Sequence, residues 1–524
     1  MKLLKVLQII RSSRTLLVLL TPLLLGSLSV FSFAPFNFTI INFFIFPALF
    51  LLLSDINKRS KNIYRKKPYL TNLFFAGYFF GFGFFCTGTY WISNSLKFDE
   101  TFQNLIPLTI VAIPAFLGIF YGISSIICGP FLKRNLGSVM LFIGAFSFID
   151  YLRSKIFSGF PWNLWGYSWS WFTEILQILN PIGLFAFNLL SVTFFTIPVI
   201  LFFTTSQKKI LIISCAIFLF FSNYIYGNYI INNNLKESEN VNIENYINFK
   251  IISPNFELKY NLSNEEIEKR ILSLIRYSDP EKEKKTIFVW PEGAISGSYF
   301  KDLENYKNHI KKNFSDKHII IFGTNTLDKN DDLFFNSLIA IDNNFEKIFQ
   351  YNKIKLVPFG EYLPIPKFFE TIGLKKITEG YGSFSKGNKN KVFSLSNTQI
   401  IPLICYEIIF PELLQKTNLS KKIVLNLSED AWFGNSIGPH QHFAKTIFRA
   451  IESNSIVVRS ANKGITAYVN NNGQVIKSLK INETGNLEYK IPIIKKQTKN
   501  KNDLIFFMLL ITYILIFITL KKND

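Results

Sequence analysis

The sequence contains few residues that could hold a metal ion or build a disulfide framework. Its 524 residues include only four Cys and four His, with no CxxC pair and no HExxH motif. Three of the Cys lie in apolar runs, and no Gly-rich phosphate-binding loop is present. The spacing His440-x-His442 would suit a metal, but no further His or Cys ligand is nearby, so a solvated or hydrogen-bonding role is favoured. We therefore expect neither a metal nor another cofactor.

Charged residues are also scarce, and basic ones outnumber acidic ones. Charged residues make up 18% of the chain, whereas hydrophobic residues make up 49% and Phe alone occupies 57 positions. This balance excludes a disordered or fibrous protein and argues against a wholly soluble one. The net charge of +21 suits either nucleic acid or an anionic membrane surface. The long apolar runs favour the membrane.

Eight apolar runs approach the length of about 20 residues that crosses a bilayer. They lie at about 14–33, 36–54, 70–92, 105–130, 136–152, 183–204, 209–229 and 503–520. If the runs alternate in direction, the clusters of Lys and Arg fall on one side, which the positive-inside rule assigns to the cytoplasm. Arg153 and Lys155 are the exception. Both termini are therefore expected in the cytoplasm, and topology explains the basic charge better than a nucleic-acid partner does.

The first apolar run follows basic residues, so a cleavable signal peptide is the competing interpretation. The end of the run, Ser32-Phe33-Ala34-Pro35-Phe36, lacks a clear small-x-small cleavage site, which favours a retained anchor. Residues 1–230 are thus predicted to hold seven transmembrane helices, and 231–248 an Asn-rich linker. Residues 249–495 are predicted to form an extracytoplasmic domain, and 496–524 the last transmembrane helix with a short cytoplasmic tail.

Short apolar strands alternate with amphipathic helices from Phe249 onward, which predicts an α/β layer domain. The expected strands are Phe249–Ile252, Thr286–Trp290, Ile319–Phe322, Ser337–Ile341, Gln399–Ile404, Ile423–Leu427, Ile456–Arg459 and Ile465–Val469. The expected helices are 263–276, 301–312, 407–416 and 439–453, and Ser263 with Glu266 forms a capping-box pattern at the first of them.

Three residues of reactive type follow the apolar segments of this domain. Glu292 and Cys405 come just after expected strands, and Lys353 lies in a segment that leads to a Pro-Phe-Gly turn. Ligands gather beyond the carboxyl ends of strands in open α/β sheets. There a carboxylate could take the proton of a thiol, and an ammonium could stabilise the oxyanion of an attacked carbonyl. Each residue alone has an ordinary interpretation, as a buried thiol, an ion-pair partner or a solvated charge, so the argument depends on the combination.

The motifs around these residues are similar to those of a known superfamily. Trp290-Pro-Glu292, Tyr351-x-Lys353-x-x-Leu-Val-Pro-Phe-Gly-Glu361-Tyr-x-Pro364 and Cys405-Tyr406-Glu407 resemble the nitrilase, or carbon–nitrogen hydrolase, superfamily. The motif Leu-Val-Pro-Phe-Gly-Glu-Tyr, together with the flanking spans, resembles the apolipoprotein N-acyltransferase family. The same holds for Phe33-Ala34-Pro35-Phe36, Gly88-Thr-Tyr-Trp91, Gly159-Phe-Pro-Trp162, Gly166-Tyr167, Gln441-His442 and Arg449-Ala450-x-Glu452. The resemblance covers nearly the whole chain.

The resemblance implies a multi-pass enzyme of the bacterial inner membrane with an α-β-β-α sandwich domain that faces the periplasm. It would move an acyl chain from a membrane phospholipid to the N-terminal amine of the S-diacylglyceryl-cysteine of apolipoproteins, the last step of lipoprotein maturation. By the same resemblance Cys405 would carry the acyl group as a thioester, Glu292 would be the general base and Lys353 the oxyanion-side cation. Glu361, Tyr406 and Glu407 would support this triad. We expect the enzyme to act as a monomer.

The sequence departs from the family pattern at Glu429-Asp430, where Asn-Asp is usual, and at Asp150, where Glu is common. One rival function is a membrane-anchored amidase or nitrilase that uses water as the acceptor. Another is a transporter or scaffold whose outer domain only binds ligands, although the spans hold few ionisable residues that could line a path. The aromatic residues between Trp162 and Trp171 suit either an interfacial belt or contact with an acyl chain.

Overall fold

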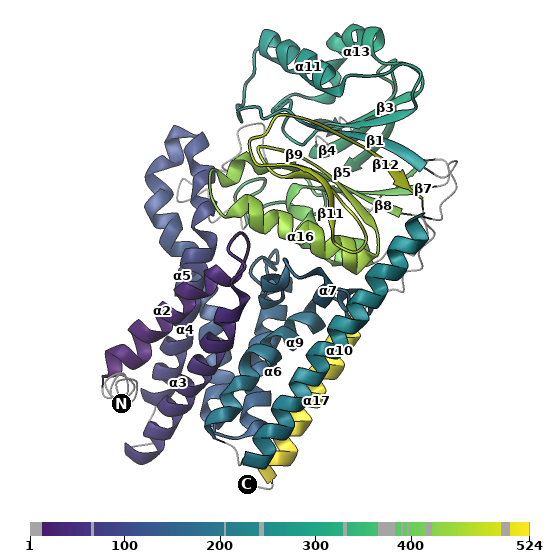
Figure 1. Cartoon of the computed structure of the whole chain (residues 1–524). Coiled ribbons are helices and arrows are strands. Elements are labelled where there is room, and N and C mark those ends of the chain that lie inside the picture. Colours follow the sequence, from purple (N-terminus) through teal and green to yellow (C-terminus); the bar gives the residue numbers. More distant parts are fainter. Residues whose placement is uncertain are drawn as a thin grey trace. The chain divides into compact units, whose positions relative to one another are not determined.

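The computed structural model divides the chain into two compact units. One consists of Met1–Ser93, Asn104–Tyr229 and Lys501–Asp524, and the other of Asn94–Gln103 and Ile230–Asn500. The residues described are 13–63, 68–203, 206–239, 246–328, 333–364, 383–388, 391–395, 398–415, 422–493 and 503–522. Figure 1 shows a helical unit and a unit built on two sheets.

Seven helices among the described residues are long and apolar enough to cross a membrane. They contain α3 (Asn42–Ile63), α4 (Pro68–Thr89), α5 (Ile106–Cys128), α6 (Leu136–Lys155), α9 (Leu184–Thr196), α10 (Ser206–Glu239) and α17 (Leu504–Lys522). These coincide with seven of the eight predicted spans. The first predicted span is a shorter apolar helix, Leu16–Ser32, which includes α2 (Thr21–Leu28).

Glycines allow the helices of this unit to pack closely. A Cβ built on Gly26 of α2 would come within 1.9 Å of the carbonyl oxygen of Phe80 in α4, and one on Gly81 within 2.9 Å of the Tyr121 side chain in α5. Small residues at such crossings let helix backbones approach each other, as is common where lipid offers no hydrophobic drive for association.

Arg153 and Lys155, which conflicted with the positive-inside rule, are charges with partners in the structure. Arg153 is 2% exposed and lies 3.1 Å from Asp150 one turn earlier in α6. Lys155 lies 3.7 Å from Asp503 at the start of the last span. Both basic residues therefore have a carboxylate partner in the structure.

Most of the aromatic residues expected at an interface belong instead to the core of the helical unit. Trp162, Trp165, Tyr167 and Trp169 are all buried, and the Trp165 ring stacks on Phe84 with centroids 4.4 Å apart. Trp171 is 51% exposed. The belt interpretation therefore holds at most for Trp171.

Two six-stranded sheets form the centre of the second unit. The first has the order β12-β1-β2-β3-β4-β5 and the second β11-β10-β9-β8-β7-β6. The strands of the first sheet are β1 (Tyr246–Ser253), β2 (Thr286–Val289), β3 (His318–Asp328), β4 (Leu333–Ile341), β5 (Lys347–Asn352) and β12 (Gly485–Pro492). Those of the second are β6 (Phe393–Leu395), β7 (Thr398–Ile404), β8 (Lys422–Glu429), β9 (Ile456–Asn462), β10 (Thr466–Val469) and β11 (Val475–Leu479).

Apolar side chains from both sheets meet in one core. Phe249, Val289 and Leu338 of the first sheet belong to the same buried cluster as Leu425 and Val458 of the second. Helices α11 (Asn264–Ser278) and α13 (Lys307–Asn313) cover the outer face of the first sheet, and α16 (Gly438–Ser453) contacts β9 and β10 of the second (Figure 1). The predicted α-β-β-α sandwich is confirmed.

All eight predicted strands are present, and three predicted segments differ in detail. Instead of one helix at 407–416, a 3₁₀ turn (Cys405–Ile409) and a four-residue helix (Glu412–Gln415) are separated by Phe410-Pro411, because Pro interrupts a helix. Instead of one helix at 301–312, the structure has three short helical segments, Phe300–Leu303, Glu304–Tyr306 and Lys307–Asn313. Helix α10 continues to Glu239, through half of the expected linker, because 231–239 has neither Gly nor Pro to end it.

Candidate active site

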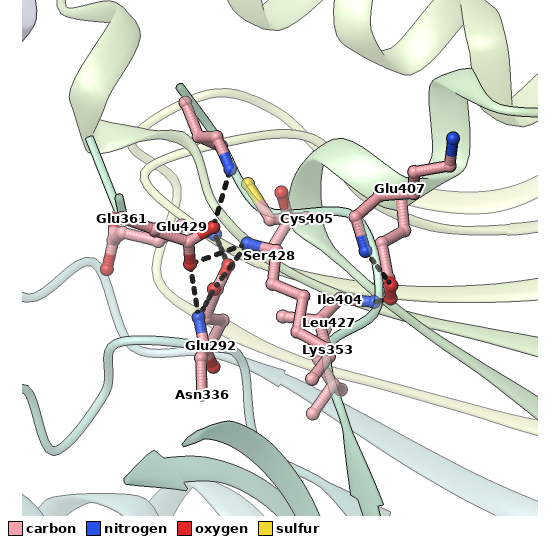
Figure 2. Close-up of polar contacts among 12 residues, drawn as sticks. Glu292, Asn336, Lys353, Glu361, Ile404, Cys405, Glu407, Leu427, Ser428 and Glu429 are labelled. Atoms are coloured by element: carbon pink, nitrogen blue, oxygen red, sulfur yellow. Dashed lines mark hydrogen bonds and ion pairs between the residues drawn. The ribbon is translucent and has the colours of Figure 1, made fainter. Parts of the chain in front are cut away.

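The three predicted reactive residues come together in the sheet unit. Glu292 follows β2, Lys353 follows β5, and Cys405 comes directly after β7, so each lies just beyond the end of a strand. Their exposed fractions are 9%, 2% and 7%. Figure 2 shows these side chains gathered with Asn336 and Glu361. Strands from both sheets therefore deliver the site residues to one buried place.

Lys353 lies between two carboxylates. Its Nζ is 3.0 Å from Oε1 of Glu361 and 3.5 Å from Oε1 of Glu292. The amide nitrogen of Asn336, in β4, donates to the same two oxygens, at 2.8 Å each. The backbone N–H of Val357 donates to the other oxygen of Glu361 at 2.8 Å. The turn-rich link between Lys353 and Glu361 thus folds back and holds the second carboxylate against the ammonium (Figure 2).

Asn336 carries no signal in the sequence pattern. It sits in the middle of an ordinary strand, and its neighbours in space come from the segments after β2 and β5. The backbone N–H of Lys353 donates to the Asn336 carbonyl at 2.9 Å, so β4 fixes both the main chain of Lys353 and the two carboxylates around its side chain.

Cys405 occupies a strained turn between β7 and the 3₁₀ segment that follows. Its φ is +47°, a left-handed conformation that non-Gly residues rarely adopt and that costs of order 1–3 kcal/mol. Strained backbone of this kind clusters at functional sites, where the surrounding structure holds it in place. At this turn the Cys405 thiol lies close enough to Glu292 and Lys353 for both charges to affect its pKa (Figure 2).

Glu407 connects the segment that follows β5 with the one that follows β7. Its carboxylate accepts hydrogen bonds from the backbone N–H groups of Ile354, Lys355 and Ile404 at 2.7–3.0 Å. The Tyr351 hydroxyl donates to it at 2.9 Å. Glu407 is fully buried, and this burial raises its pKa to about 7. It therefore holds the Lys353 segment and the Cys405 segment in register.

Tyr406 contributes differently from the charged residues. Its ring packs edge-on against Phe410, the residue that follows the 3₁₀ turn, with centroids 5.1 Å apart. Its backbone N–H follows the Cys405 carbonyl directly, which gives the main chain a donor next to the thiol.

The electrostatics of the site favour a protonated thiol and a charged amine at rest. Burial raises the pKa of the Cys405 thiol and the nearby Glu292 adds to the rise, while Lys353 opposes it. Burial would lower the pKa of Lys353, but Glu292 and Glu361 outweigh it, so the net shift is upward. A thiol that is protonated at rest can act as a nucleophile only if a nearby base takes its proton.

Similar proteins were found by sequence. An apolipoprotein N-acyltransferase N-terminal domain model matches residues 25–197, and a carbon–nitrogen hydrolase model matches residues 258–493. The apolipoprotein N-acyltransferase of Rhizobium etli is 30% identical over 473 residues, which covers 88% of this chain and 87% of that protein. That of Rickettsia bellii is 31% identical over 480 residues, covering 90% of each. The chain belongs to the apolipoprotein N-acyltransferase family.

Two solved structures also align with part of this chain. An amidase of the nitrilase superfamily from Nesterenkonia aligns with a TM-score of 0.35 at 15% identity, covering 48% of this chain and 93% of that one. Saccharomyces cerevisiae Nit3 aligns with a TM-score of 0.34 at 15% identity, covering 47% and 90%. As a member of the N-acyltransferase family, the chain is an acyltransferase with apolar helices of membrane-spanning length.

Glu429, where the family resemblance implies Asn, contacts the site. Its backbone N–H donates to Oε2 of Glu292 at 3.2 Å. Its side chain accepts from Asn462 at 2.9 Å and from the Ala431 N–H at 3.0 Å. Burial raises the pKa of Glu429 well above its ordinary value. A neutral carboxylic acid here would present a carbonyl oxygen much as an amide does, so the departure changes little of the hydrogen bonding around Glu292.

Gly293 explains how so large a side chain fits. A Cβ at this position would lie 2.3 Å from Oε2 of Glu429, and its φ of +71° is one that suits Gly. The residue after Glu292 must therefore be Gly in this chain. Asp150, the other departure, lies in the helical unit and is paired with Arg153.

Proposed function

We propose that this family member transfers a fatty acyl chain from a membrane phospholipid to the N-terminal amine of the S-diacylglyceryl-cysteine of apolipoproteins, through a thioester on Cys405. The observation that carries the proposal is the buried Lys353, held between Glu292 and Glu361 with Cys405 within electrostatic reach. Family membership supports the acceptor, and the apolar helices support a lipid donor.

In the first half-reaction Glu292 takes the proton of the Cys405 thiol as the sulfur attacks the ester carbonyl carbon of the phospholipid. Lys353 and the backbone N–H of Tyr406 stabilise the oxyanion that forms. The C–O bond to the glycerol then breaks, and the departing oxygen receives the proton from Glu292. A lysophospholipid leaves and the acyl group stays on Cys405.

In the second half-reaction the lipoprotein amine attacks the thioester carbonyl. Glu292 takes a proton from the nitrogen, the C–S bond breaks, and the thiolate receives that proton. The Cys405 thiol is restored and the amide product leaves. Glu292 passes on each proton that it takes and ends both half-reactions as a carboxylate, so the net charge of the buried site is the same before and after each half-reaction.

Glu361 has the role of holding Lys353 rather than moving protons. Its carboxylate oxygens accept from Lys353 and Asn336 and from the Val357 N–H, whereas Glu292 is the carboxylate close enough to Cys405 to raise the pKa of the thiol. Glu292 lies 3.5 Å from Lys353, so the ammonium is closer to Glu361.

Incubation of the purified enzyme with a phospholipid and a diacylated lipopeptide tests this function. The expected products are N-acylated lipopeptide and lysophospholipid. Free fatty acid without acylated peptide would instead identify a hydrolase that uses water.

The location proposed for the enzyme is the bacterial inner membrane, with the sheet unit in the periplasm and both termini in the cytoplasm. The distribution of Lys and Arg among the spans supports it, with Arg153 and Lys155 as the dissenting pair. Diacylated lipoprotein substrates carry their amine at the membrane surface, where a domain joined to spans at both ends can reach it.

A further inference from the structure

A chain of buried polar groups outside the carboxylate cluster contacts the backbone of Cys405. His442, in α16, has its Nε2 3.3 Å from the carbonyl oxygen of Cys405 and its Nδ1 3.0 Å from Oδ1 of Asp430. His442 is 0% and Asp430 1% exposed. Neither residue takes part in the proton transfers proposed above.

Asp430 is in turn fixed by residues of the second sheet. Arg459 of β9 donates to its Oδ2 at 2.7 Å, and the Ser428 hydroxyl of β8 donates to its Oδ1 at 2.6 Å. Burial would raise the pKa of Asp430, but Arg459 and His442 outweigh it and hold the pKa below its ordinary value. Asp430 is therefore a charged group that holds the Arg459 guanidinium beside the imidazole. Residues from β8, β9 and the turn after β8 together set the position of His442.

The imidazole contacts the main chain of the nucleophile, at the peptide group that joins Cys405 to Tyr406. A carbonyl oxygen only accepts hydrogen bonds, so the Nε2 that faces it carries a proton and donates. Burial lowers the pKa of His442, which favours a neutral ring whose Nδ1 has no proton and accepts from the Arg459 guanidinium, 3.2 Å away.

The orientation of that peptide group matters for the chemistry. In a planar trans peptide the C=O and the N–H point in opposite directions. When His442 holds the Cys405 carbonyl on one side, the Tyr406 N–H is aimed to the other. Cys405 has a φ of +47°, so an unrestrained peptide here would relax toward a commoner conformation and turn the N–H away.

We infer that His442, held by Asp430 and Arg459, is a positioning residue that aims the Tyr406 N–H at the oxyanion formed on the acyl carbonyl. The inference rests on the proposed function, because it assigns an oxyanion donor to that reaction. It predicts that His442 affects acyl transfer to and from Cys405 and leaves the intrinsic reactivity of the thiol alone.

Two rates measured on the purified full-length enzyme test this. The first is single-turnover acylation of Cys405 by a phospholipid, which passes through an oxyanion. The second is alkylation of Cys405 by iodoacetamide, which displaces iodide without one. His442→Phe keeps a ring in place and removes the donor, and it should slow acylation by about 10²-fold, the effect of losing one oxyanion donor, with alkylation unchanged. His442→Gln supplies an amide donor and should recover much of the acylation rate.

His440→Phe is the matched control, two residues earlier on the same helix and without a contact to Cys405 among the hydrogen bonds described. Both of its rates should equal those of the wild type. Wild-type acylation in His442→Phe would overturn the inference. So would equal losses of acylation and alkylation that His442→Gln fails to restore, because they would assign His442 to the fold. A wild-type enzyme whose Cys405 alkylates normally and takes no acyl group would overturn the proposed function itself.

Discussion

Replacement of Glu292 by Gln tests whether this carboxylate carries the proton, because the variant loses the base while keeping most of the hydrogen bonds around it. Both carboxylate oxygens of Glu292 face donors: Oε1 faces Asn336 and Lys353, and Oε2 faces the Glu429 N–H. A Gln amide has one oxygen and one NH₂, so one of these donors loses its acceptor. A lost buried hydrogen bond of this kind costs about 1–3 kcal/mol of stability. The variant should therefore still fold, at a lower melting temperature.

The effect of Glu292→Gln on chemistry should be much larger than its effect on stability. An amide cannot take the thiol proton, and general-base catalysis is typically worth about 10²–10⁴-fold. The Cys405 pKa is already raised by burial, so little thiolate would form without the base. Single-turnover acylation of Cys405 by a phospholipid should thus be slower by about that factor.

Glu361→Gln is the comparison that tests the division of roles. It alters a carboxylate that also contacts Lys353 and Asn336, so the structural cost is similar. Because Glu292 remains, Cys405 should still be acylated, whereas transfer to a lipopeptide added as a chase should be poor with Lys353 misplaced. If Cys405 is acylated at the wild-type rate in Glu292→Gln and is not acylated in Glu361→Gln, the two roles are the reverse of those proposed.

Three further results are expected. Cys405→Ser should form no acyl-enzyme and keep the wild-type melting temperature, since a hydroxyl is far harder to deprotonate than a thiol; full transfer activity in this variant would remove the thioester mechanism. Burial raises the pKa of Glu407 from 4.5 to about 7. Its contribution to the free energy of unfolding is therefore fully present below about pH 4.5 and is lost as the pH rises through 7. Measurements of unfolding against pH should show this loss in the wild type and not in Glu407→Gln. A Cys introduced at Asn233 should be labelled from the periplasmic side and one at Lys521 from the cytoplasmic side, and labelling of both from one side would refute the topology.

Much of the site is predictable because its residues carry local signals. Glu292 and Cys405 each follow an apolar strand. The resemblance of the flanking motifs then predicts, from the amino-acid sequence alone, that both lie in one site with Lys353. The strands themselves are predictable from short β-branched and aromatic runs. Strand β11 escapes prediction because its residues are exposed or half-exposed and include two polar ones, and β12 because none but Ile491 is buried.

The remaining features depend on contacts between distant parts of the chain. Asn336 looks like any polar strand residue, and only the arrangement of β4 beside the segment after β5 brings it to two carboxylates. His442 is expected from its sequence context to form hydrogen bonds or be solvated, but its partners, 12 and 37 positions away, cannot be inferred from spacing. Arg153 has the sequence signature of a loop charge, and only its burial against Asp150 shows otherwise.

The most direct test of the central claim is mass spectrometry of the purified enzyme after incubation with a phospholipid of defined acyl chains. The account predicts that a peptide containing Cys405 gains the mass of one acyl group, that hydroxylamine removes it as expected for a thioester, and that a diacylated lipopeptide takes it up as an amide. N-acylated lipopeptide produced while Cys405 never carries the acyl group would contradict the account.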